Sequence, residues 1–365
     1  MASQLKMKKK VFVGLSGGVD SSVSACLLKK AGYDVTGVFI KTWTPDWLEC
    51  TWKEDRLDAM RVCVRLGIPF LTLDLEKEYK RDVVDYMIAE YKAGRTPNPD
   101  VMCNKYIKFG GFFDFAMKQG ADYVATGHYA RVKKLSAVNF RLLAGKDNNK
   151  DQSYFLWTIT QKQLAKTFFP IGDLIKPEVR KLAKKFGLLT ADKKDSQGLC
   201  FMGKVDVKDF LSHYIEKKRG KVLNESGQEI GYHDGAVFLT IGERHGFMVT
   251  KKTPNDKPYF IIAKDIKKNT ITIAHFKQNK ILPTSTKEVI IRDINLISSS
   301  FNQSDSILAR VRYRQPLQRA GIVNLKSGVK NGELKVKFDE PQIVAPGQSV
   351  VFYKGEECLG GGIII

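Results

Sequence analysis

One stretch decides the fold at the start of this 365-residue chain: Val11-Phe12-Val13-Gly14-Leu15-Ser16-Gly17-Gly18-Val19-Asp20-Ser21-Ser22. A short apolar strand, 11–15, leads directly into a pair of glycines, and a helical pattern over 21–31 follows at once. Adjacent glycines let the backbone approach an anion closely, and a helix that begins there adds free N–H groups and the positive end of its dipole. The order of strand, loop and helix therefore predicts a phosphate-binding loop. The alternative is a simple turn, with Asp20 and Ser21 capping the helix.

Strands and helices alternate on the C-terminal side of this loop. Apolar runs predict strands at 35–40, 70–75 and 123–126, and helical patterns cover 54–66, 77–92 and 105–118. This alternation is typical of βαβ units, which form a parallel sheet covered on both faces. Ligands of such sheets bind at the carboxyl ends of the strands, which is where the glycine loop falls.

The sequence pattern changes after about residue 201. A helical piece at 207–217 precedes short segments that predict strands at 220–224, 236–239, 259–263 and 270–274. From about residue 287 to the end, β-branched runs alternate with turn signals, which is typical of an all-β domain. We therefore predict an α/β domain with a parallel sheet over 1–205, a small mixed central domain over 206–282 and an all-β barrel over 283–365.

Charge is the unusual feature of the composition. The 60 Lys and Arg residues outnumber the 39 Asp and Glu residues and leave a formal net charge of +21. Such an excess favours a polyanionic partner, either nucleic acid or an anionic membrane surface, while solubility alone is the alternative. No run approaches 18 consecutive apolar residues, so we expect no membrane-spanning helix. Residues 1–10 lack the apolar region of a secretory signal.

The six cysteines are scattered, and none of them forms a Cys-x-x-Cys pair. This spacing suits neither a disulfide scaffold nor a metal knuckle, so it favours a reducing, cytoplasmic location. Cys26, Cys63 and Cys358 lie in apolar patterns and are predicted to fill the core. Cys50 lies in a Trp-rich segment and has no predicted role.

The other two cysteines have neighbours that could support a thiolate. Cys103 follows a segment with two prolines, 95–102, which predicts an exposed loop whose next helix, from about Lys105, presents its N-terminus to the thiol. Cys200 lies in Gly198-Leu199-Cys200-Phe201, with two lysines nearby in sequence. For both residues, a structural role is an equally good reading of the local sequence.

Several segments together resemble one family, the tRNA-specific 2-thiouridylases. The glycine loop is neither a Walker A motif nor Gly-x-Gly-x-x-Gly. Its Ser-Gly-Gly-x-Asp-Ser pattern resembles the PP-loop of ATP pyrophosphatases, a superfamily with an adenine nucleotide alpha hydrolase-like fold. The motifs that carry the resemblance to the thiouridylases are 16–21, 93–100, 103–104, 125–129, 150–155, 198–201, 312–315 and 346–349.

This resemblance implies an ATP-dependent replacement of the carbon-2 oxygen of a tRNA wobble uridine by sulfur, with release of AMP and pyrophosphate. It implies an ATP site made of Gly14, Leu15, Ser16, Gly17, Gly18, Val19, Asp20, Ser21, Ile40 and Gly127. Asp20 could also serve as a ligand of Mg²⁺, because hard cations prefer carboxylate oxygens.

The resemblance also implies roles for the two thiols. Cys200 would carry a persulfide delivered by a sulfur donor protein, either a relay protein or a cysteine desulfurase. Cys103 would be the partner thiol, and a Cys103–Cys200 disulfide would release the transferred sulfur. Asp100 would act as general acid and base, and Asn98, Pro99 and Asp100 would contact the target base. Further contacts to tRNA would come from His128, Lys150, Asp151, Gln152, Arg312, Tyr313 and Gln348.

Two of these positions have a local alternative. Arg310, Arg312 and Arg314 recur at every second residue, so on a strand they would share one face, which could follow a phosphate backbone or simply face solvent. Asp151 could cap a helix predicted over 153–164 instead of contacting tRNA.

Two other functions compete with thiolation. One is an ATP pyrophosphatase that acts on a small molecule or on a different nucleoside, such as a lysidine-forming ligase. The other is an RNA-binding protein without catalytic activity. The large positive charge disfavours the first, and the intact Asp20, Asp100, Cys103 and Cys200 disfavour the second.

Overall fold

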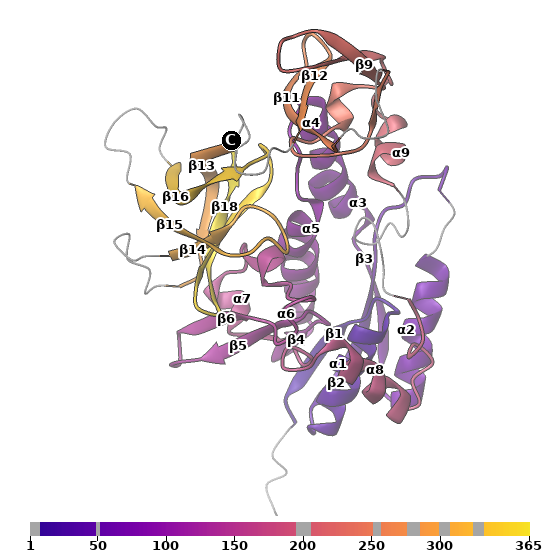
Figure 1. Cartoon of the computed structure of the whole chain (residues 1–365). Helices are drawn as coiled ribbons and strands as arrows, with labels where there is room; N and C mark the ends of the chain where they lie inside the picture. The colour runs from indigo at the N-terminus through magenta and orange to yellow at the C-terminus, as the bar shows by residue number, and fades with distance from the viewer. Residues whose placement is uncertain are drawn as a thin grey trace, which may run out of the picture.

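A computed structural model describes residues 8–48, 52–194, 206–250, 257–275, 285–298, 307–323 and 332–365. Figure 1 shows three parts: an α/β part that holds both α1 and α2, a small sheet that holds β9 and β12, and a barrel that holds β13 to β18. Among the described helices, none is long and apolar enough to cross a membrane. The predicted fold class is confirmed in all three parts.

The N-terminal part is built on a parallel sheet with the strand order β3-β2-β1-β4-β7. Its strands are β1 (Lys10–Gly14), β2 (Asp34–Lys41), β3 (Phe70–Asp74), β4 (Tyr123–Ala125) and β7 (Thr167–Phe168). From β1 the chain adds β2 and β3 on one side and then returns to add β4 on the other. The carboxyl ends of β1 and β4 therefore form the topological switch point, where ligands of such sheets bind.

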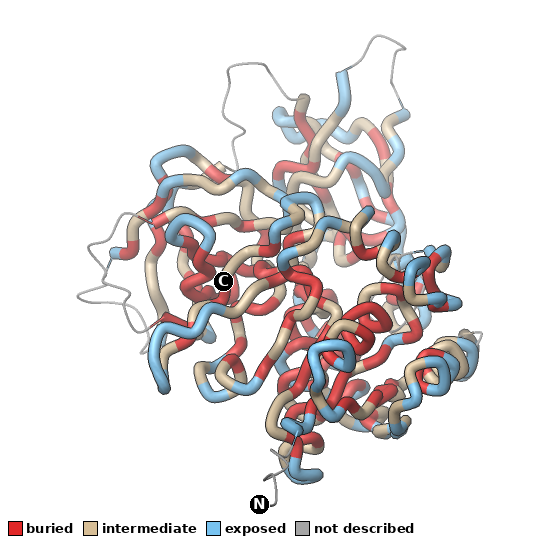
Figure 2. Tube along the Cα trace, turned by 90° about the horizontal axis from the view of Figure 1, so that it is seen from below, coloured by how far each residue is buried: buried red, intermediate tan, exposed pale blue. Residues whose placement is uncertain are grey.

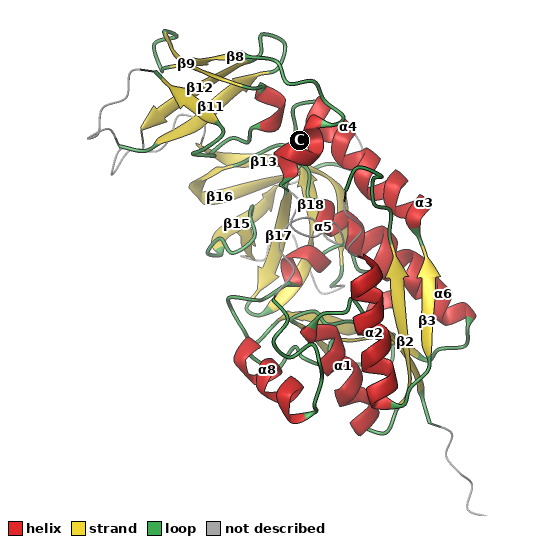
Figure 3. Cartoon of the chain, turned by 90° about the vertical axis from the view of Figure 1, so that its right-hand side faces the viewer, coloured by secondary structure: helices red, strands yellow, loops and turns green. Residues whose placement is uncertain are grey.

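Helices cover both faces of this sheet, as Figure 3 shows. The helices α1 (Val19–Lys30), α2 (Trp52–Leu66) and α8 (Lys176–Lys185) lie together beside it. Two long helical stretches, over 76–92 and over 99–118, pack against the other face, where they share a core with Phe12, Val38 and Ile40 of the sheet. Both stretches contain π-helical turns. The first is α3 (Glu76–Tyr79), η1 (Lys80–Asp85) and α4 (Tyr86–Lys92), and the second is α5 (Pro99–Met102), η2 (Cys103–Phe112) and α6 (Phe113–Lys118).

The central part is a five-stranded sheet in the order β10-β9-β8-β12-β11. Its elements are α9 (Val207–Ser212), β8 (Gly220–Leu223), β9 (Glu229–His233), η4 (Ala236–Phe238), β10 (Phe247–Val249), β11 (Tyr259–Asp265) and β12 (Thr270–His275). The predicted strand at 236–239 is wrong, because this segment forms the 3₁₀ turn η4. Gly235 turns the backbone with φ of 145°, and the side chain of Asn269 accepts a hydrogen bond from the Ala236 N–H.

The C-terminal part is an antiparallel barrel, closed by pairing of β13 with β18. Its strands are β13 (Ser285–Leu296), β14 (Ile307–Arg310), β15 (Gln318–Val323), β16 (Leu334–Ile343), β17 (Ser349–Lys354) and β18 (Glu357–Ile364). The hairpin of β5 (Ala130–Lys134) and β6 (Phe140–Ala144) extends the same sheet through β18. The N-terminal part therefore contributes strands to the barrel sheet, which the sequence pattern did not predict.

The segment after this hairpin packs against the barrel strand β17. Trp157 is 1% exposed and its indole N–H donates to the hydroxyl of Ser349, while the Tyr154 hydroxyl donates to the Ser349 carbonyl. The predicted helix over 153–164 is therefore wrong: η3 (Ser153–Leu156) and α7 (Gln161–Leu164) are separate. The first element ends after Leu156, and the capping box of Thr160 begins a new helix.

Burial follows this organisation. In Figure 2 the buried segments run through the sheet and the barrel, and exposed segments lie on the outer turns. The predicted core cysteines Cys26, Cys63 and Cys358 are all buried, which is as predicted. Burial raises the pKa of the Cys63 and Cys358 thiols to about 12, so neither is a thiolate at neutral pH. The predicted domain boundaries, near 205 and 283, lie outside the described residues, as does Cys50.

Candidate functional site

The glycine loop between β1 and α1 has the conformation that an anion cradle requires. Gly17 has φ of 72°, and a Cβ added there would lie 2.3 Å from the carbonyl oxygen of Asp55. The Ser16 N–H donates to the Ser21 hydroxyl at 3.2 Å, which closes the loop over the start of α1. Only a residue without a side chain fits at position 17, because both the backbone angle and the space exclude a Cβ.

The end of β4 approaches this loop equally closely. A Cβ on Gly127 would lie 2.7 Å from the backbone nitrogen of Ser21. The two segments at the switch point, after β1 and after β4, are therefore in direct backbone contact.

A cavity of about 260 Å³ opens between these segments, and we call it the apolar cavity. Phe39, Ile40 and Trp52 supply its apolar wall, and Lys108, Thr126 and His128 lie among its polar lining. Of the residues expected at an ATP site, those that line it are Gly14, Leu15, Ser16, Asp20, Ser21, Ile40 and Gly127. An apolar wall next to a loop with the conformation of an anion cradle suits an adenosine phosphate.

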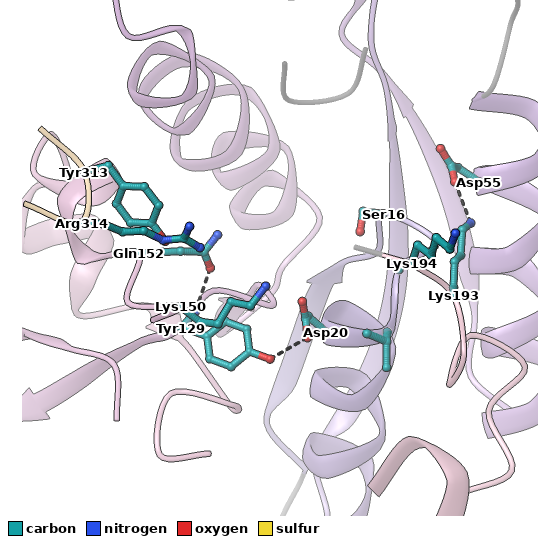
Figure 4. Close-up of a pocket in the computed structure, with 12 residues that line it drawn as sticks. Ser16, Asp20, Asp55, Tyr129, Lys150, Gln152, Lys193, Lys194, Tyr313 and Arg314 are labelled. Atoms are coloured by element: carbon teal, nitrogen blue, oxygen red, sulfur yellow. Dashed lines mark hydrogen bonds and ion pairs between the residues drawn. The ribbon is translucent and has the colours of Figure 1, made fainter. Parts of the chain in front are cut away.

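A second cavity of about 250 Å³ adjoins the first, and we call it the basic cavity. Figure 4 shows Tyr313, Arg314, Gln152 and Lys150 on one side, with Asp55, Lys193 and Lys194 on the other. The residues that line both cavities are Ser16, Asp20, Asp55 and Gln152. Gly18 and Val19 line the basic cavity only, so the glycine loop forms the partition between the two.

Asp20 stands at this partition. Its carboxylate accepts hydrogen bonds from the Tyr129 hydroxyl at 2.8 Å and from the Lys176 ammonium, which lies 2.8 Å from each oxygen. Within the described ranges, no group of three or more His, Cys, Asp or Glu side chains gathers to hold a metal. One carboxylate beside a phosphate loop is nevertheless the protein contribution that Mg²⁺-nucleotides use, since phosphates and waters supply the other ligands. Asp20 fits that role if a cation displaces Lys176.

His128 lines the apolar cavity and is only 6% exposed. One ring nitrogen lies 2.7 Å from the Thr126 hydroxyl, and the other lies 3.4 Å from the Lys108 ammonium. Burial, and to a lesser extent the charge of Lys108, lower the pKa of His128 well below its usual value. The imidazole is therefore neutral at pH 7.

Cys103 is placed differently from the prediction. The sequence favoured an exposed loop, but the helix already begins at Pro99, with the Asn98 side chain as its cap, and Cys103 lies one turn later with no exposed surface. Proline is tolerated in the first turn of a helix because its missing N–H has no partner there. The thiol is thus buried in the core rather than placed at a helix N-terminus. Asp100, half-buried, lies in the same first turn.

Cys200 lies outside the described residues, as do its neighbours in 195–205. Its proximity to Cys103 therefore stays a prediction. The described chain on the N-terminal side ends at Lys194, in the wall of the basic cavity.

The three alternating arginines do not share a face, so that prediction is wrong. The strand β14 ends at Arg310, and Arg314 has φ of 63° in the turn that follows. Arg310 is half-buried and pairs with the buried Asp151, and Arg312 donates to the Ile241 carbonyl at 2.7 Å. Arg314 alone of the three is exposed, and it lines the basic cavity.

Gln348 ties the barrel to the segment before α5. Its amide group donates to the carbonyl oxygens of Thr96 and Pro97 at 2.9 and 3.1 Å. Together with the bond from Arg312 to the central part, this contact positions the barrel against the other two parts. The structure brings Lys150, Gln152 and Tyr313 to the basic cavity and leaves Arg312 and Gln348 at the junctions between parts.

Asp151 has an internal role. Its carboxylate is 5% exposed, accepts N–H bonds from Gly145 and Ser153, and pairs with Arg310 at 3.0 Å. The helix that it was predicted to cap does not form as one element. The carboxylate instead joins the segment before η3 to the barrel strand β14.

Replacing Arg310 with methionine is expected to lower the free energy of unfolding by about 3 kcal/mol, because it leaves the buried Asp151 carboxylate without its counter-charge. Urea denaturation measures this change. As the matched control, Lys335→Met removes an exposed barrel ion pair with Glu288 and should change the free energy by less than about 1 kcal/mol. Equal effects of the two substitutions would contradict a buried structural pair.

Several residues of the site are not among those predicted from the sequence. Lys108, Thr126, Tyr129, Lys176 and Lys193 all line or support the two cavities. Thr126 and Tyr129 lie within a motif that was noted, so their neighbourhood was a usable signal. No signal in the sequence pointed to Lys176, because it lies 156 residues from the carboxylate that it contacts.

Three family models match the chain in order. They are described as the tRNA methyl transferase HUP domain over residues 9–204, the tRNA methyl transferase PRC-barrel domain over 208–275 and the aminomethyltransferase beta-barrel domain over 286–364. Together they cover the three parts described above.

Curated relatives match over nearly the whole length. The tRNA-specific 2-thiouridylase MnmA of Streptococcus sanguinis is 46% identical over 98% of this chain and 95% of its own. The protein of the same name from Streptococcus uberis is 47% identical with the same coverage. Among solved structures, NMN synthetase from Francisella tularensis has a TM-score of 0.33 and 18% identity over 56% of this chain and 72% of that chain, which is too low to bear on function.

Proposed function

The chain belongs to the family of tRNA-specific 2-thiouridylases, and we propose that it uses ATP to replace the carbon-2 oxygen of a tRNA wobble uridine by sulfur. It is therefore a sulfurtransferase that acts on tRNA, and the finer steps below are our proposal. A cytoplasmic location remains a prediction.

One observation supports this function above the others: two cavities of different chemistry share one phosphate loop. Among the described residues, the lining of the apolar cavity comes from the N-terminal part alone, but the basic cavity also takes Tyr313 and Arg314 from the turn after β14 of the barrel. An enzyme for a small molecule needs no second domain at its phosphate loop. A tRNA does, because its backbone must be held while one base reaches the nucleotide, and such a base has to leave its stack.

ATP would lie with its adenosine against Phe39 and Ile40 and its terminal phosphates on the loop at 14–21. The N–H groups of the loop and the start of α1 favour the negative charge of the departing pyrophosphate. Asp20 would hold Mg²⁺ together with the phosphates, and the ion would neutralise their charge. Lys176 is the group that it would displace from this carboxylate.

Sulfur transfer would follow adenylation of the uracil oxygen, which turns a poor leaving group into AMP. The terminal sulfur of a persulfide on Cys200 would attack carbon 2, and AMP would leave with the former oxygen. The thiolate of Cys103 would then attack the inner sulfur of Cys200, forming the disulfide and releasing the thiocarbonyl. Asp100, in the first turn of α5, would move the protons. Because Cys103 is fully buried, this step requires a movement that exposes its thiol.

The persulfide would come from a sulfur donor protein, either a relay protein or a cysteine desulfurase. The Cys103–Cys200 disulfide must be reduced before the next turnover, since its formation supplies the two electrons that release the sulfur as a thiocarbonyl.

The test is incubation of the protein with unmodified tRNA, ATP, magnesium and a persulfide source, followed by mass spectrometry of the nucleosides. We expect one sulfur in place of one oxygen, at the wobble uridine only, and one AMP for each sulfur. Sulfur at another nucleoside, or AMP formation that depends on a small molecule and not on tRNA, would contradict the proposal.

Binding of tRNA is expected to weaken steeply with salt, because each phosphate that meets a lysine or arginine releases condensed counterions. Arg314→Ala should reduce the slope of log K against log salt concentration by about one, since one phosphate contact is lost. The control is Arg319→Ala, which removes an exposed arginine of β15 that lines neither cavity. Fluorescence anisotropy with labelled tRNA measures both slopes, and equal slopes in the two variants would contradict a role for Arg314.

A further inference from the structure

One cation faces the apolar cavity, and no step above uses it. Among the described residues that line this cavity, Lys108 is the only lysine or arginine. It is half-buried and lies on η2, in the same helical stretch as Asp100 and Cys103. This π-helical segment spans ten residues, and π-helical insertions within helices are frequent at functional sites.

The His128 ring contacts the Lys108 ammonium, and Thr126 in turn holds the His128 ring. An ammonium only donates hydrogen bonds, so the His128 Nε2 at 3.4 Å must be the acceptor. The ring proton then sits on Nδ1, which donates to the Thr126 hydroxyl at 2.7 Å. The rings of Phe109 and Phe169 pack around the imidazole at centroid distances of 6.1 and 5.9 Å. His128 is therefore a fixed, neutral support for the cation.

The position of Lys108 in the site indicates which phosphate of ATP it would bind. The loop and Asp20, with Lys176, form the end of the site that receives the terminal phosphates. Lys108 lines the apolar cavity and not the basic one, and it lies on the helical stretch that carries Asp100, which is proposed to contact the target base. The phosphorus atom between the pyrophosphate and the base oxygen is the α-phosphorus of ATP, so a cation on this side faces the α-phosphate.

We propose that Lys108 is a catalytic residue that binds the α-phosphate of ATP and stabilises the transition state of adenylation, with His128 and Thr126 as positioning residues. This inference rests on the proposed function. In the step concerned, the carbon-2 oxygen of uracil forms a bond to the α-phosphorus, and the bond from that phosphorus to the bridging oxygen breaks. Pyrophosphate leaves with the electron pair, and the uracil N3 proton passes to a base, for which Asp100 is proposed. The Lys108 ammonium donates to an α-phosphate oxygen throughout and keeps its proton.

The test uses two probes that separate the ends of the site, AMP for the α-phosphate and inorganic pyrophosphate for the loop. Calorimetry on the full chain is expected to show that Lys108→Met weakens AMP binding at least tenfold and changes pyrophosphate binding less than twofold. A charged hydrogen bond in a half-buried site is worth this much. The matched control is Lys105→Met, which removes an exposed lysine of the same helix that lines neither cavity and should change neither affinity.

Single-turnover assays with tRNA supply the second readout. Lys108→Met should slow AMP formation by 10²- to 10³-fold, the effect typical of losing one preorganised donor to a transition state. Lys108→Arg should recover part of the rate, and His128→Asn should lower the rate with a smaller loss of AMP affinity. Thermal unfolding confirms that each variant is folded.

Two outcomes would overturn the assignment. One is an unchanged affinity for AMP in Lys108→Met, and the other is an equal loss of affinity for AMP and for pyrophosphate in that variant. Failure of the proposed function looks different, because the wild-type protein would then thiolate no tRNA. If AMP binding still separated Lys108→Met from Lys105→Met in that case, Lys108 would stand as the α-phosphate ligand of another adenylating reaction.

Discussion

The substitutions Cys200→Ser and Cys103→Ser are each expected to abolish tRNA thiolation. No sulfur should be detectable in the wobble uridine after a time in which the wild-type protein completes many turnovers. A serine hydroxyl at 200 cannot carry a persulfide, and a hydroxyl at 103 cannot close the disulfide that frees the sulfur. Mass spectrometry of the nucleosides measures the loss. Because adenylation comes first, Cys200→Ser should still release pyrophosphate in a burst of about one per enzyme.

The control for these variants is Cys26→Ser, which places the same hydroxyl at another buried thiol, in α1 and close to the phosphate loop in sequence. It should keep the wild-type activity of each folded molecule. Unchanged thiolation in both Cys103→Ser and Cys200→Ser would remove the persulfide–disulfide mechanism. The family and the nucleotide site would stand, since neither depends on the thiols.

The substitution Gly17→Ala is expected to weaken ATP binding at least 100-fold. The backbone there has φ of 72°, which costs an L-residue about 1–2 kcal/mol. The added Cβ would also lie 2.3 Å from the Asp55 carbonyl oxygen, so the loop or the start of α2 must shift. The N–H groups of the loop then no longer converge on the phosphates. Calorimetric titration with ATP and magnesium measures the loss. The affinity for pyrophosphate should fall in parallel.

Gly120→Ala separates the backbone penalty from the clash. Gly120 has φ of 78°, almost the value of Gly17, but a Cβ there meets nothing within 4 Å. This control should lose some stability and keep wild-type ATP affinity. Equal ATP affinity in the two variants would show that the loop does not bind the phosphates.

The elements around the glycine loop were predictable because their signals are local. Apolar runs, a glycine pair and helix starts determine the backbone conformation within a few residues. Accordingly, β1, α1, β2 and β4 form close to their predicted bounds. The same locality explains the errors. Two prolines before Cys103 indicated a loop, but Pro99 occupies the first turn of α5, where its missing N–H costs nothing.

The arginine row shows a second kind of error. Alternation predicts one face only while the strand continues, and β14 ends at Arg310. After Arg310, the Gln315 side chain accepts the hydrogen bond of the Val311 N–H. Asp151, 159 residues away, pairs with the Arg310 guanidinium. No pattern within 308–314 contains that information.

By itself, the sequence determined the phosphate loop, the order of the three parts and the family, because each depends on residue types at short, fixed spacings. Only the tertiary structure decided that two cavities share the loop, that Lys176 meets Asp20 and that His128 supports Lys108. These pairs join segments that are 156 and 20 residues apart, and the packing of the sheet, the helices and the barrel brings them together. Charge composition indicated a polyanion, but the location of each cation depends on contacts that no local pattern encodes.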